Sequence, residues 1–375
     1  MSKAISKKDQ LFELVRANPY ISQQELATQL QLSRSAVAGY VANLTKDGRI
    51  LGRAYVLPDY SPIVCIGGAN IDRKLRSKAP LQLGTSNPVS QDESYGGVAR
   101  NIAENLARLG SSVRLLCAVG DDAAGQSLLA QADSAGIDVA ASLQVSGALS
   151  GSYTALLNDA GDLVLAMAHM ELCEALTPQF LSNRQQQRAN AVMTIADMNL
   201  PSESLQLLLD EARLSHSPLV VVAVSQPKMA RLPVQLRGLR LLILNQSELE
   251  ERHGTLLSTQ DEIVAASRHL QSQGVQDVIV TLGDKGVLLS DSQGTNEWRF
   301  VPSEQINLTE VVDVTGAGDA FAAGVCWSLC EVPDDLMLAC QRGQTLAALT
   351  VKTASTVAQC LHPTLFNEIS LCNPI

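Results

Sequence analysis

The feature that most constrains the fold is a succession of short, continuous apolar runs from Ile63 onward. Longer stretches with helical spacing of apolar residues separate many of these runs. A strand that is apolar at every position is typical of a sheet covered by helices on both faces, so we predict an open α/β sheet. The predicted strands are 63–67, 113–118, 192–195, 219–224, 241–244, 278–282, 287–290 and 298–301, and the predicted helices are 98–109, 123–135, 202–214 and 260–273.

One pair of apolar segments does not follow this alternation. Residues 152–158 and 163–168 flank the turn Asp159-Ala160-Gly161-Asp162, which is typical of a β-hairpin. We predict that this hairpin, within about 150–170, and a piece near 82–95 form a small β lid over the site.

Composition places the chain among soluble globular proteins. Its 375 residues, 46% of them hydrophobic, suffice for one large domain and a smaller one. No run reaches the roughly 18 apolar residues of a membrane span, and the N-terminus lacks a signal-peptide core, so we predict a cytoplasmic protein without membrane partners. The eight cysteines form no CxxC pair, which favours buried thiols over disulfides or zinc.

The charge is unevenly distributed. Residues 1–57 carry 8 Lys/Arg against 4 Asp/Glu, although the whole chain has a net charge of −10. A small basic head attached to an acidic body indicates two parts with different partners, and only the head suits nucleic acid.

The basic head has the pattern of a winged helix-turn-helix. Ser22 and Glu25 fit a capping box, and a turn at 31–33 precedes a second helix that runs to about Leu44. Residues 50–57 are predicted to form a short hairpin, the wing. We therefore predict this domain at 1–57, a proline-containing linker at 58–62 and the main domain at 63–375.

The second helix predicts a DNA contact surface. Arg34, Ser35 and Tyr40 are expected to face the major groove, and Lys46, Arg49 and Arg53 to meet phosphates. The alternative is a packing or dimerisation module that does not touch DNA.

The strongest chemical signal is Asp313-Val314-Thr315-Gly316-Ala317-Gly318-Asp319, followed by a helical stretch. Small residues at 316–318 let an anion approach the backbone, and a helix N-terminus favours negative charge there. Asp319 in the first turn is placed to accept a proton from an attacking hydroxyl. The alternative is an ordinary glycine-rich turn with an acidic residue after it.

Three further motifs follow in a fixed order: Gly96-Gly97-Val98-Ala99-Arg100-Asn101, Asn245-Gln246-Ser247-Glu248 and Thr281-Leu282-Gly283-Asp284-Lys285-Gly286. Together with 313–319 they resemble the signature of the ribokinase, or PfkB, family of carbohydrate kinases over about residues 62–365. The phrasing at 96–110 is most similar to bacterial pseudouridine kinases and related nucleoside kinases. The resemblance implies a ribokinase-like three-layer α/β/α sandwich with a β lid.

The resemblance also implies site residues and cofactors. Asp319 would be the catalytic base, and Gly316, Ala317 and Gly318 would hold the γ-phosphate of ATP. Substrate hydroxyls would meet Asn70, Asp72, Gly97 and Asn101. Asn245 would bind the nucleotide and, with Glu248, organise Mg²⁺ partly through water, while Thr281, Gly283 and Gly286 would line the nucleotide site. Asp313 and Thr315 resemble the start of a monovalent-cation loop, which makes K⁺ a candidate ligand.

Two segments depart from the family pattern. Relatives place an aspartate near the end of the 219–224 strand, where this chain reads Val222-Ala223-Val224, so one group that would support substrate, metal or nucleotide at that edge is missing. The lid segment Ala166-Met167-Ala168-His169-Met170 lacks the carboxylate or amide expected for a pseudouridine-type site. We therefore expect a changed base preference, and a packing or surface role for His169.

The leading hypothesis is an ATP-dependent kinase that phosphorylates the 5′-hydroxyl of a nucleoside, such as pseudouridine or another ribonucleoside. The alternatives are a sugar kinase of the ribose or fructose type and a transcriptional regulator that uses the kinase fold as a ligand sensor. The expected partners are the small-molecule substrate, DNA through residues 1–57, and a second copy in a homodimer.

Overall fold

The computed structural model describes residues 6–52, 61–215, 217–290 and 297–372. The chain divides into two compact units, Met1–Pro62 with Leu181–Ala191, and Ile63–Phe180 with Val192–Ile375. Most of the predicted hairpin at 50–57 and of the predicted linker at 58–62 lies outside the described residues, as does Arg53.

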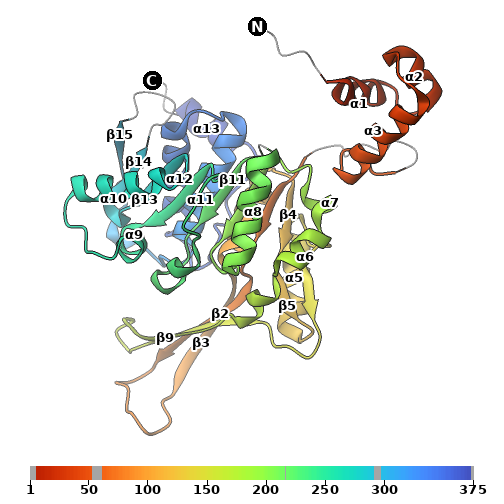
Figure 1. Cartoon of the computed structure of the whole chain (residues 1–375). Helices are drawn as coiled ribbons and strands as arrows, with labels where there is room; N and C mark the ends of the chain where they lie inside the picture. Colours follow the sequence, from red (N-terminus) through yellow and green to blue (C-terminus); the bar gives the residue numbers. More distant parts are fainter. Residues whose placement is uncertain (1–5, 53–60, 216, 291–296, 373–375) are drawn as a thin grey trace. The chain divides into compact units, whose positions relative to one another are not determined.

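The N-terminal unit begins with α1 (Lys7–Ala17), α2 (Gln23–Leu30) and α3 (Arg34–Lys46) (Figure 1). The predicted capping box starts α2: the Ser22 hydroxyl accepts from the Glu25 N–H, and the Glu25 carboxylate accepts from the Ser22 N–H. Gln31 turns the chain with φ 53° before α3. The three helices share one apolar core formed by Leu11, Val15, Ile21, Leu26, Ala27, Leu30, Val37, Leu44 and Ile50.

The large sheet has the order β15-β14-β13-β12-β11-β10-β1-β4-β6. Neighbours from β6 to β13 are parallel, whereas β14 and β15 are antiparallel. After β1, the chain adds β4 and β6 on one side of β1 and then adds β10 on the other side. The direction of strand addition reverses there, so the topological switch point lies between β1 and β10. The strands are β1 (Ile63–Ile66), β4 (Val113–Leu116), β6 (Ile137–Asp138), β10 (Met193–Asp197), β11 (Leu219–Val222), β12 (Leu241–Asn245), β13 (Asp277–Thr281), β14 (Gly286–Ser290) and β15 (Trp298–Pro302).

One predicted strand is divided. The run at 113–118 ends as β4 at Leu116 and resumes as β5 (Ala118–Gly120), which pairs with β7 (Leu143–Val145) outside the large sheet. The apolar run is continuous, but the Ser142 hydroxyl donates to the Leu115 carbonyl and accepts from the Cys117 N–H, which separates the two ladders.

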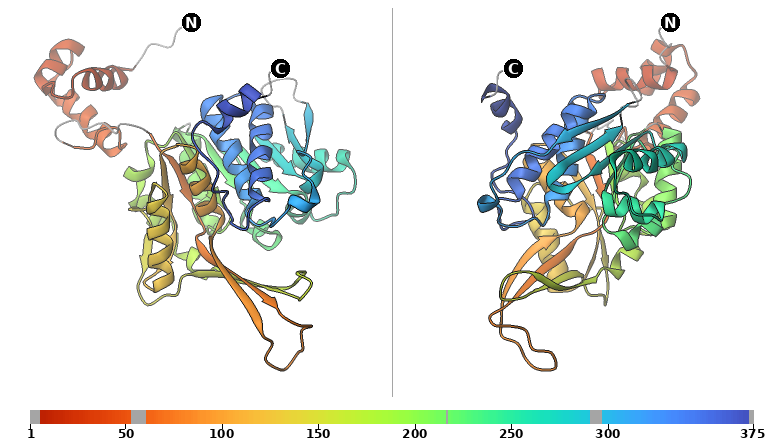
Figure 2. Two further views of the ribbon diagram at one scale, coloured as in Figure 1. Left: turned by 180° about the vertical axis from the view of Figure 1, so that it is seen from behind. Right: turned by 90° about the vertical axis from the view of Figure 1, so that its left-hand side faces the viewer.

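Helices cover both faces of the large sheet, as predicted (Figures 1 and 2). On one face Ile63 and Cys65 pack with α4 (Val98–Arg108), α5 (Ala123–Ser134), α11 (Ala317–Glu331) and α12 (Leu336–Thr350). Val64 and Ile66 are equally buried and point to the opposite face by strand alternation, where α8 (Ser202–Ser215), α9 (Gln246–His253) and α10 (Gln260–Ser272) lie.

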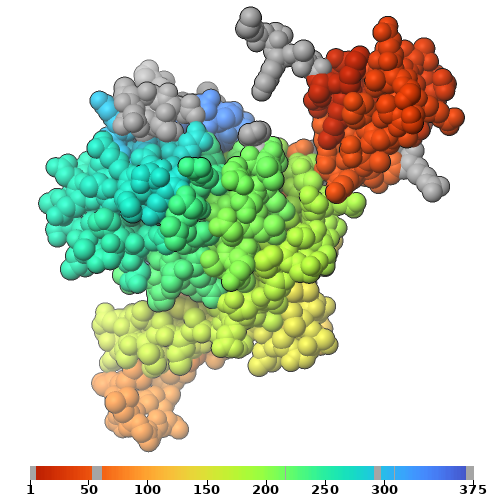
Figure 3. Space-filling view, in the orientation of Figure 1, coloured from red at the N-terminus to blue at the C-terminus, as the bar shows by residue number. Residues whose placement is uncertain are grey.

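The lid is a four-stranded sheet of order β3-β2-β8-β9. The predicted hairpin forms β8 (Gly151–Leu157) and β9 (Leu163–His169), and the piece predicted near 82–95 is β3 (Val89–Gly96). The strand β2 (Asn70–Ser77), which lies between β3 and β8, was not predicted from the sequence. The loop joining β2 to β3 projects from the body in the space-filling view (Figure 3).

Short elements complete the described chain: η1 (Glu171–Ala175), α6 (Pro178–Asn183), α7 (Gln185–Arg188), η2 (Gln226–Arg231), η3 (Gly283–Lys285), η4 (Leu308–Glu310) and α13 (Leu365–Cys372). Within the described residues, no helix combines the length and apolar character needed to cross a bilayer. Of the cysteines described as free, Cys65, Cys117, Cys173, Cys326 and Cys340 are buried, whereas Cys330 and Cys360 are exposed.

Candidate active site

The N-terminus of α11 is built by a glycine that no other residue can replace without strain. Gly316 precedes the helix with φ 84°, and a Cβ at this position would lie 2.1 Å from the Thr356 carbonyl oxygen. In the described part of the chain no side chain caps this helix. The amide groups and positive dipole of its first turn are therefore available to an anion.

Asp319 lies in this first turn with a raised pKa. Burial raises the pKa of its carboxyl to about 7, and the charges of Asp197 and Asp72 act in the same direction. The hydrogen bond from Asn101 and the charge of Arg100 oppose the shift but do not cancel it. A carboxylate with a pKa near neutrality has the basicity that a general base requires.

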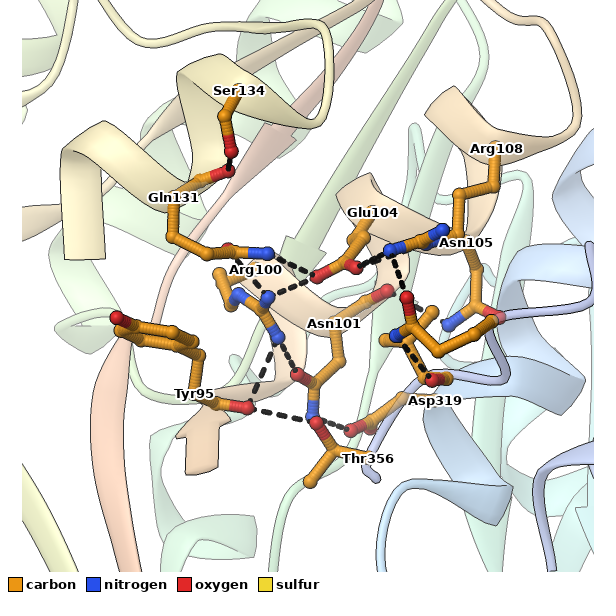
Figure 4. Close-up of polar contacts among 12 residues, drawn as sticks. Tyr95, Arg100, Asn101, Glu104, Asn105, Arg108, Gln131, Ser134, Asp319 and Thr356 are labelled. Atoms are coloured by element: carbon orange, nitrogen blue, oxygen red, sulfur yellow. Dashed lines mark hydrogen bonds and ion pairs between the residues drawn. The ribbon is translucent and has the colours of Figure 1, made fainter. Parts of the chain in front are cut away.

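Asn101, on α4, connects Asp319 to a buried polar network (Figure 4). Its Nδ2 donates to Asp319 Oδ2 at 2.7 Å, and its Oδ1 accepts from Arg100 Nη1 at 2.8 Å. Arg100 also donates to the Tyr95 carbonyl at 3.0 Å, and Thr356 Oγ1 donates to the same oxygen at 2.7 Å. These contacts fix which end of the Asn101 amide faces Asp319.

The charged part of this network was not predicted from the sequence. Arg100 and Arg108 both pair with Glu104, and the side chains of Arg100 and Glu104 are only 3% and 2% exposed. Gln131 donates to Glu104 at 3.2 Å. The sequence does contain a signal for these ion pairs: Arg100, Glu104 and Arg108 follow one another at i, i+4 spacing on a helix whose neighbouring positions are apolar.

A second missed residue, Asp197, lies at the switch point where β10 ends. Its Oδ2 accepts from the N–H groups of Gly68, at 2.8 Å, and Ala99, at 2.9 Å, and its Oδ1 accepts from the Asn199 N–H at 2.8 Å. Asp197 is fully buried, and this burial raises the pKa of its carboxyl. The carboxylate thus joins the loop after β1 to the start of α4.

The predicted sugar-binding residues lie together on this side of the site. Asn70 and Asp72 belong to β2 rather than to the end of β1, and Asn70 Nδ2 donates to Asp72 Oδ1 at 2.6 Å. Gly96, opposite Asn70 on β3, leaves room for Asp72, because a Cβ there would lie 2.1 Å from its carboxylate. Gly97, with φ 100°, lets α4 start against the Gly68 carbonyl.

The predicted nucleotide-side residues lie at the ends of β12 and β13. Asn245 is in register with Thr281 across the two strands. Gly283 and Gly286 follow with φ 64° and 127°, and a Cβ at Gly286 would lie 2.2 Å from the Val301 carbonyl. The glycines therefore permit the tight turn into β14.

Asn245 and Glu248 also have a structural role, which was not predicted from the sequence. Asn245 Oδ1 accepts from the Glu248 N–H and Glu248 Oε2 accepts from the Asn245 N–H, both at 2.8 Å, which makes a capping box at the start of α9. Burial raises the pKa of the Glu248 carboxyl. The described residues contain no group of three or more His, Cys, Asp or Glu that suits a metal ion. These two side chains fit Mg²⁺ only where phosphate oxygens and water complete its shell.

Asp313 and Thr315 lie in the loop that precedes α11, and both contact the lid. Lys74, on β2, forms an ion pair with Asp313 and donates to Thr315 Oγ1 at 3.1 Å. Lys74 has no local sequence signal, because its partners are 239 and 241 residues away.

The two segments that depart from the family pattern lie at the end of β11 and in the lid. β11 ends at Val222, and Ala223 donates its N–H to the Ile243 carbonyl. Lys228, on η2, contacts Asn199 Oδ1 beside this strand end. In the lid His169 is exposed, whereas Met170 lies near both Gly68 and Gly151.

In the N-terminal unit, Arg34 and Ser35 are exposed at the start of α3. Tyr40 instead packs partly against the core of the unit. Arg49 forms an ion pair with Asp9 and lies over the Phe12 ring, so its charge is partly engaged within the unit.

Comparison with known proteins agrees with this geometry. Residues 61–364 match the model of the pfkB family of carbohydrate kinases, and residues 10–50 match a winged helix-turn-helix DNA-binding model. The chain is 33% identical to YeiI, described as an uncharacterized sugar kinase of Escherichia coli (strain K12), over 326 residues, which cover 87% of this chain and 88% of that protein.

One further sequence relative and one solved structure are also similar to this chain. A pseudouridine kinase of the same strain is 36% identical over 267 residues, covering 71% of this chain and 83% of that protein. The solved structure of a carbohydrate kinase from Agrobacterium tumefaciens superposes with a TM-score of 0.68 at 30% identity, covering 82% of this chain and 96% of that one.

These matches confirm the predicted ribokinase-like fold, the predicted enzyme class and the predicted N-terminal domain type. The chain belongs to the PfkB family of carbohydrate kinases, phosphotransferases that act on the hydroxyl groups of sugars and nucleosides, and it carries an N-terminal winged helix-turn-helix domain.

Proposed function

We propose that the chain transfers the γ-phosphoryl group of ATP to the 5′-hydroxyl of a nucleoside, with Asp319 as the general base. The observation that carries the proposal is the position of Asp319: it lies in the first turn of α11, has a pKa of about 7 and receives a hydrogen bond from Asn101. A base at a helix N-terminus takes the hydroxyl proton beside the amide groups that stabilise the transferring phosphoryl group.

The surrounding residues bind the substrate, the γ-phosphate and the nucleotide in this proposal. Asn70 and Asp72 hold the ribose hydroxyls, because they are buried polar groups on the lid strand that pairs with β3 next to Gly97. Gly316, Ala317 and Gly318 hold the γ-phosphate. Thr281, Gly283 and Gly286 line the nucleotide site.

A divalent cation bound to the nucleotide neutralises phosphate charge during the transfer. Asn245 and Glu248 orient its water ligands in this proposal. The capping box supports that role, since it fixes both side chains at the carboxyl edge of the sheet. Mg²⁺ is the cation we expect, because it retains several waters and accepts carboxylate and amide oxygens around them.

A nucleoside is favoured over a free sugar by the 36% identity to a pseudouridine kinase. The lid supplies a second argument. A Cβ at Gly68 would lie 3.2 Å from Met170 Cε, and one at Gly151 would lie 3.0 Å from Met170 Sδ, so this thioether borders the loop after β1. A polarizable thioether packs well against an aromatic base.

The experiment is a substrate panel with ATP and Mg²⁺. Pseudouridine, uridine, inosine, guanosine, ribose and fructose are compared by kcat/KM for ADP formation, and the product is located by phosphorus NMR. We expect 5′-phosphorylated nucleosides and a higher kcat/KM for at least one nucleoside than for either sugar. Turnover of ribose or fructose without turnover of any nucleoside would replace the proposal with the sugar-kinase alternative.

DNA binding is a second candidate function, carried by the match of residues 10–50 to a DNA-binding winged helix-turn-helix and by the exposed Arg34 and Ser35 at the start of α3. We propose that these two side chains reach base edges in the major groove. Tyr40 is half-buried and is assigned a supporting position, and Arg53 lies among the residues expected to meet phosphates.

The DNA test uses the full chain and fragments of the genome from which it comes. Arg34→Ala is expected to abolish retardation of the bound fragment and to leave kinase turnover unchanged. Arg16→Ala is the matched control, because Arg16 is an exposed arginine at the end of α1, away from α3 in sequence. Absence of any retarded fragment with the unmodified protein would exclude the regulator function.

A further inference from the structure

Lys74 connects the lid to the loop that enters the anion hole. It projects from β2, and its ammonium group is ion-paired with the Asp313 carboxylate and donates to Thr315 Oγ1 at 3.1 Å. The side chains of Lys74 and Asp313 are 27% and 19% exposed. Partial burial makes this pair less screened by solvent than a surface ion pair.

These contacts engage the side-chain oxygens of Asp313 and Thr315. Asp313 Oδ1 accepts from the Thr315 N–H at 3.0 Å and from the Thr315 hydroxyl at 2.8 Å, while Oδ2 faces Lys74. The Thr315 hydroxyl therefore donates to Asp313 and accepts from Lys74. The N–H groups of Val312 and Asp313 both donate to the Val351 carbonyl, which fixes the loop on its other side.

The Lys74 ammonium group lies between the proposed sugar-binding side of the site, at Asp72, and the proposed phosphate-binding side, at Gly316. Lys74 and Asp72 are two residues apart on β2, so they project from the same face of the strand. Burial lowers the pKa of the Lys74 ammonium, and the charge of Asp72 opposes this shift. Thr315 directly precedes Gly316, where the anion hole begins. A single lid strand thus presents a carboxylate on the sugar side and a cation to the loop that positions the phosphate site.

We propose that the Lys74 ammonium is the resident cation of the 313–315 loop, in place of the bound K⁺ that the family resemblance suggests for Asp313 and Thr315. A lysine ammonium is a compact charge with three donors, and it satisfies the same carboxylate and hydroxyl oxygens that would hold a monovalent ion. Lys74 is a positioning residue: it fixes the loop, and the loop fixes the start of α11. The proposal rests on the proposed function only through the role of α11 as the anion hole.

Two consequences follow for the unmodified protein. Its turnover and its melting temperature are the same in K⁺ as in tetramethylammonium, an ion too large for the loop, at equal ionic strength. A requirement for K⁺ appears only when the ammonium group is removed, because the loop oxygens then face each other without a cation.

The experiment compares Lys74→Met with the unmodified protein in both salts. Lys74→Met keeps most of the aliphatic stem, and we expect kcat in tetramethylammonium to fall on the order of tenfold to hundredfold, the usual loss when a group that orients a site residue is removed. K⁺ or NH₄⁺ should restore most of the loss, with a smaller effect on KM. Lys74→Ala serves as a second variant if the methionine variant does not fold.

Melting curves give a readout independent of turnover. A newly created ion site must raise the melting temperature of Lys74→Met with increasing K⁺, since an ion that binds only the folded state stabilises it by mass action. Lys78→Ala is the matched control: Lys78 directly follows β2, is exposed, and its N–H donates to the Pro88 carbonyl. It should show neither effect.

The outcomes separate this inference from the proposed function. Activation and stabilisation of the unmodified protein by K⁺ would overturn the inference. A melting temperature of Lys74→Met that does not change with K⁺ concentration would also overturn it. If no acceptor is phosphorylated by the unmodified protein, the proposed function fails, whereas the melting curves still decide whether Lys74 replaces the ion.

Discussion

Asn101 and Asp319 are 218 residues apart in the chain, and the Asn101 amide Nδ2 donates to Asp319 Oδ2 at 2.7 Å. The bond joins α4 to α11, the two helices whose N-termini border the site. Because Arg100 holds the other end of the amide, Asn101 presents a donor to Asp319 and favours its ionised form. Burial acts more strongly in the opposite direction and leaves the pKa of Asp319 at about 7.

The first prediction is a pH profile governed by Asp319. The carboxylate is the active form of a general base, and kcat/KM reports the pKa of the free enzyme. We expect kcat/KM to rise about tenfold per pH unit up to a pKa of about 7 and then to level off. If kcat/KM instead levelled off at the ordinary aspartate pKa, near pH 4, burial would not raise the pKa of Asp319 in this site.

The second prediction concerns Asp319→Asn. Loss of the base should reduce kcat by about 10² to 10⁴ and leave nucleotide binding intact. Near-normal turnover would remove Asp319 from the base role.

The same variant has a stability signature. The folded pKa of Asp319, about 7, exceeds the ordinary aspartate value of 3.8, so the folded state holds this proton more tightly than the unfolded state. The resulting stabilisation is complete below pH 3.8 and is lost progressively as the pH rises to about 7. Asparagine does not ionise, so its contribution to stability does not change with pH. The melting temperature of the variant should therefore rise relative to that of the unmodified protein as the pH increases across that interval. A pH-independent difference between the two melting temperatures would contradict the raised pKa.

Much of the architecture could be predicted because its signals are local. Continuous apolar runs such as Val220–Val222 specify buried strands, and the Ser22 and Glu25 capping box marks a helix start. The residues at 313–319 could be assigned roles because they match a family motif.

The parts that escaped prediction depend on distant pairing. β2 carries Arg73, Lys74 and Arg76 in a segment of low apolar content, and its strand conformation comes from pairing with β3 and β8 on either side. Asp197 is a single carboxylate after an apolar strand. Its importance comes from N–H groups of Gly68 and Ala99, 129 and 98 residues away, which no local pattern reveals.

The third prediction is that Asn101→Leu moves the acidic limb of the profile to higher pH. The substitution removes the hydrogen bond that lowers the pKa of Asp319 and leaves burial and the charges of Asp197 and Asp72 in place. Loss of a hydrogen bond to a charged group costs about 1.5–3 kcal/mol, so kcat/KM at neutral pH should fall about tenfold to hundredfold. An unchanged limb with reduced kcat/KM would show that Asn101 contacts substrate without tuning the base.

The fourth prediction tests the start of α11 through Gly316→Ala. The added Cβ would lie 2.1 Å from the Thr356 carbonyl at φ 84°, so the backbone must shift and the first turn of α11 must move with it. We expect kcat to fall by about 10² or more, because the amide groups no longer converge on the phosphate, and the free energy of unfolding to fall by about 1–3 kcal/mol.

Gly254→Ala is the matched control for this strain. Gly254 has φ 81°, but no atom lies within 4 Å of its Cβ position, and it ends α9 rather than opening α11. It should lose about 1–2 kcal/mol from the left-handed backbone alone and keep its kcat. If both variants lose stability equally and neither loses kcat, then the close approach of Thr356 to Gly316 does not position the anion hole, and the phosphate must be held elsewhere.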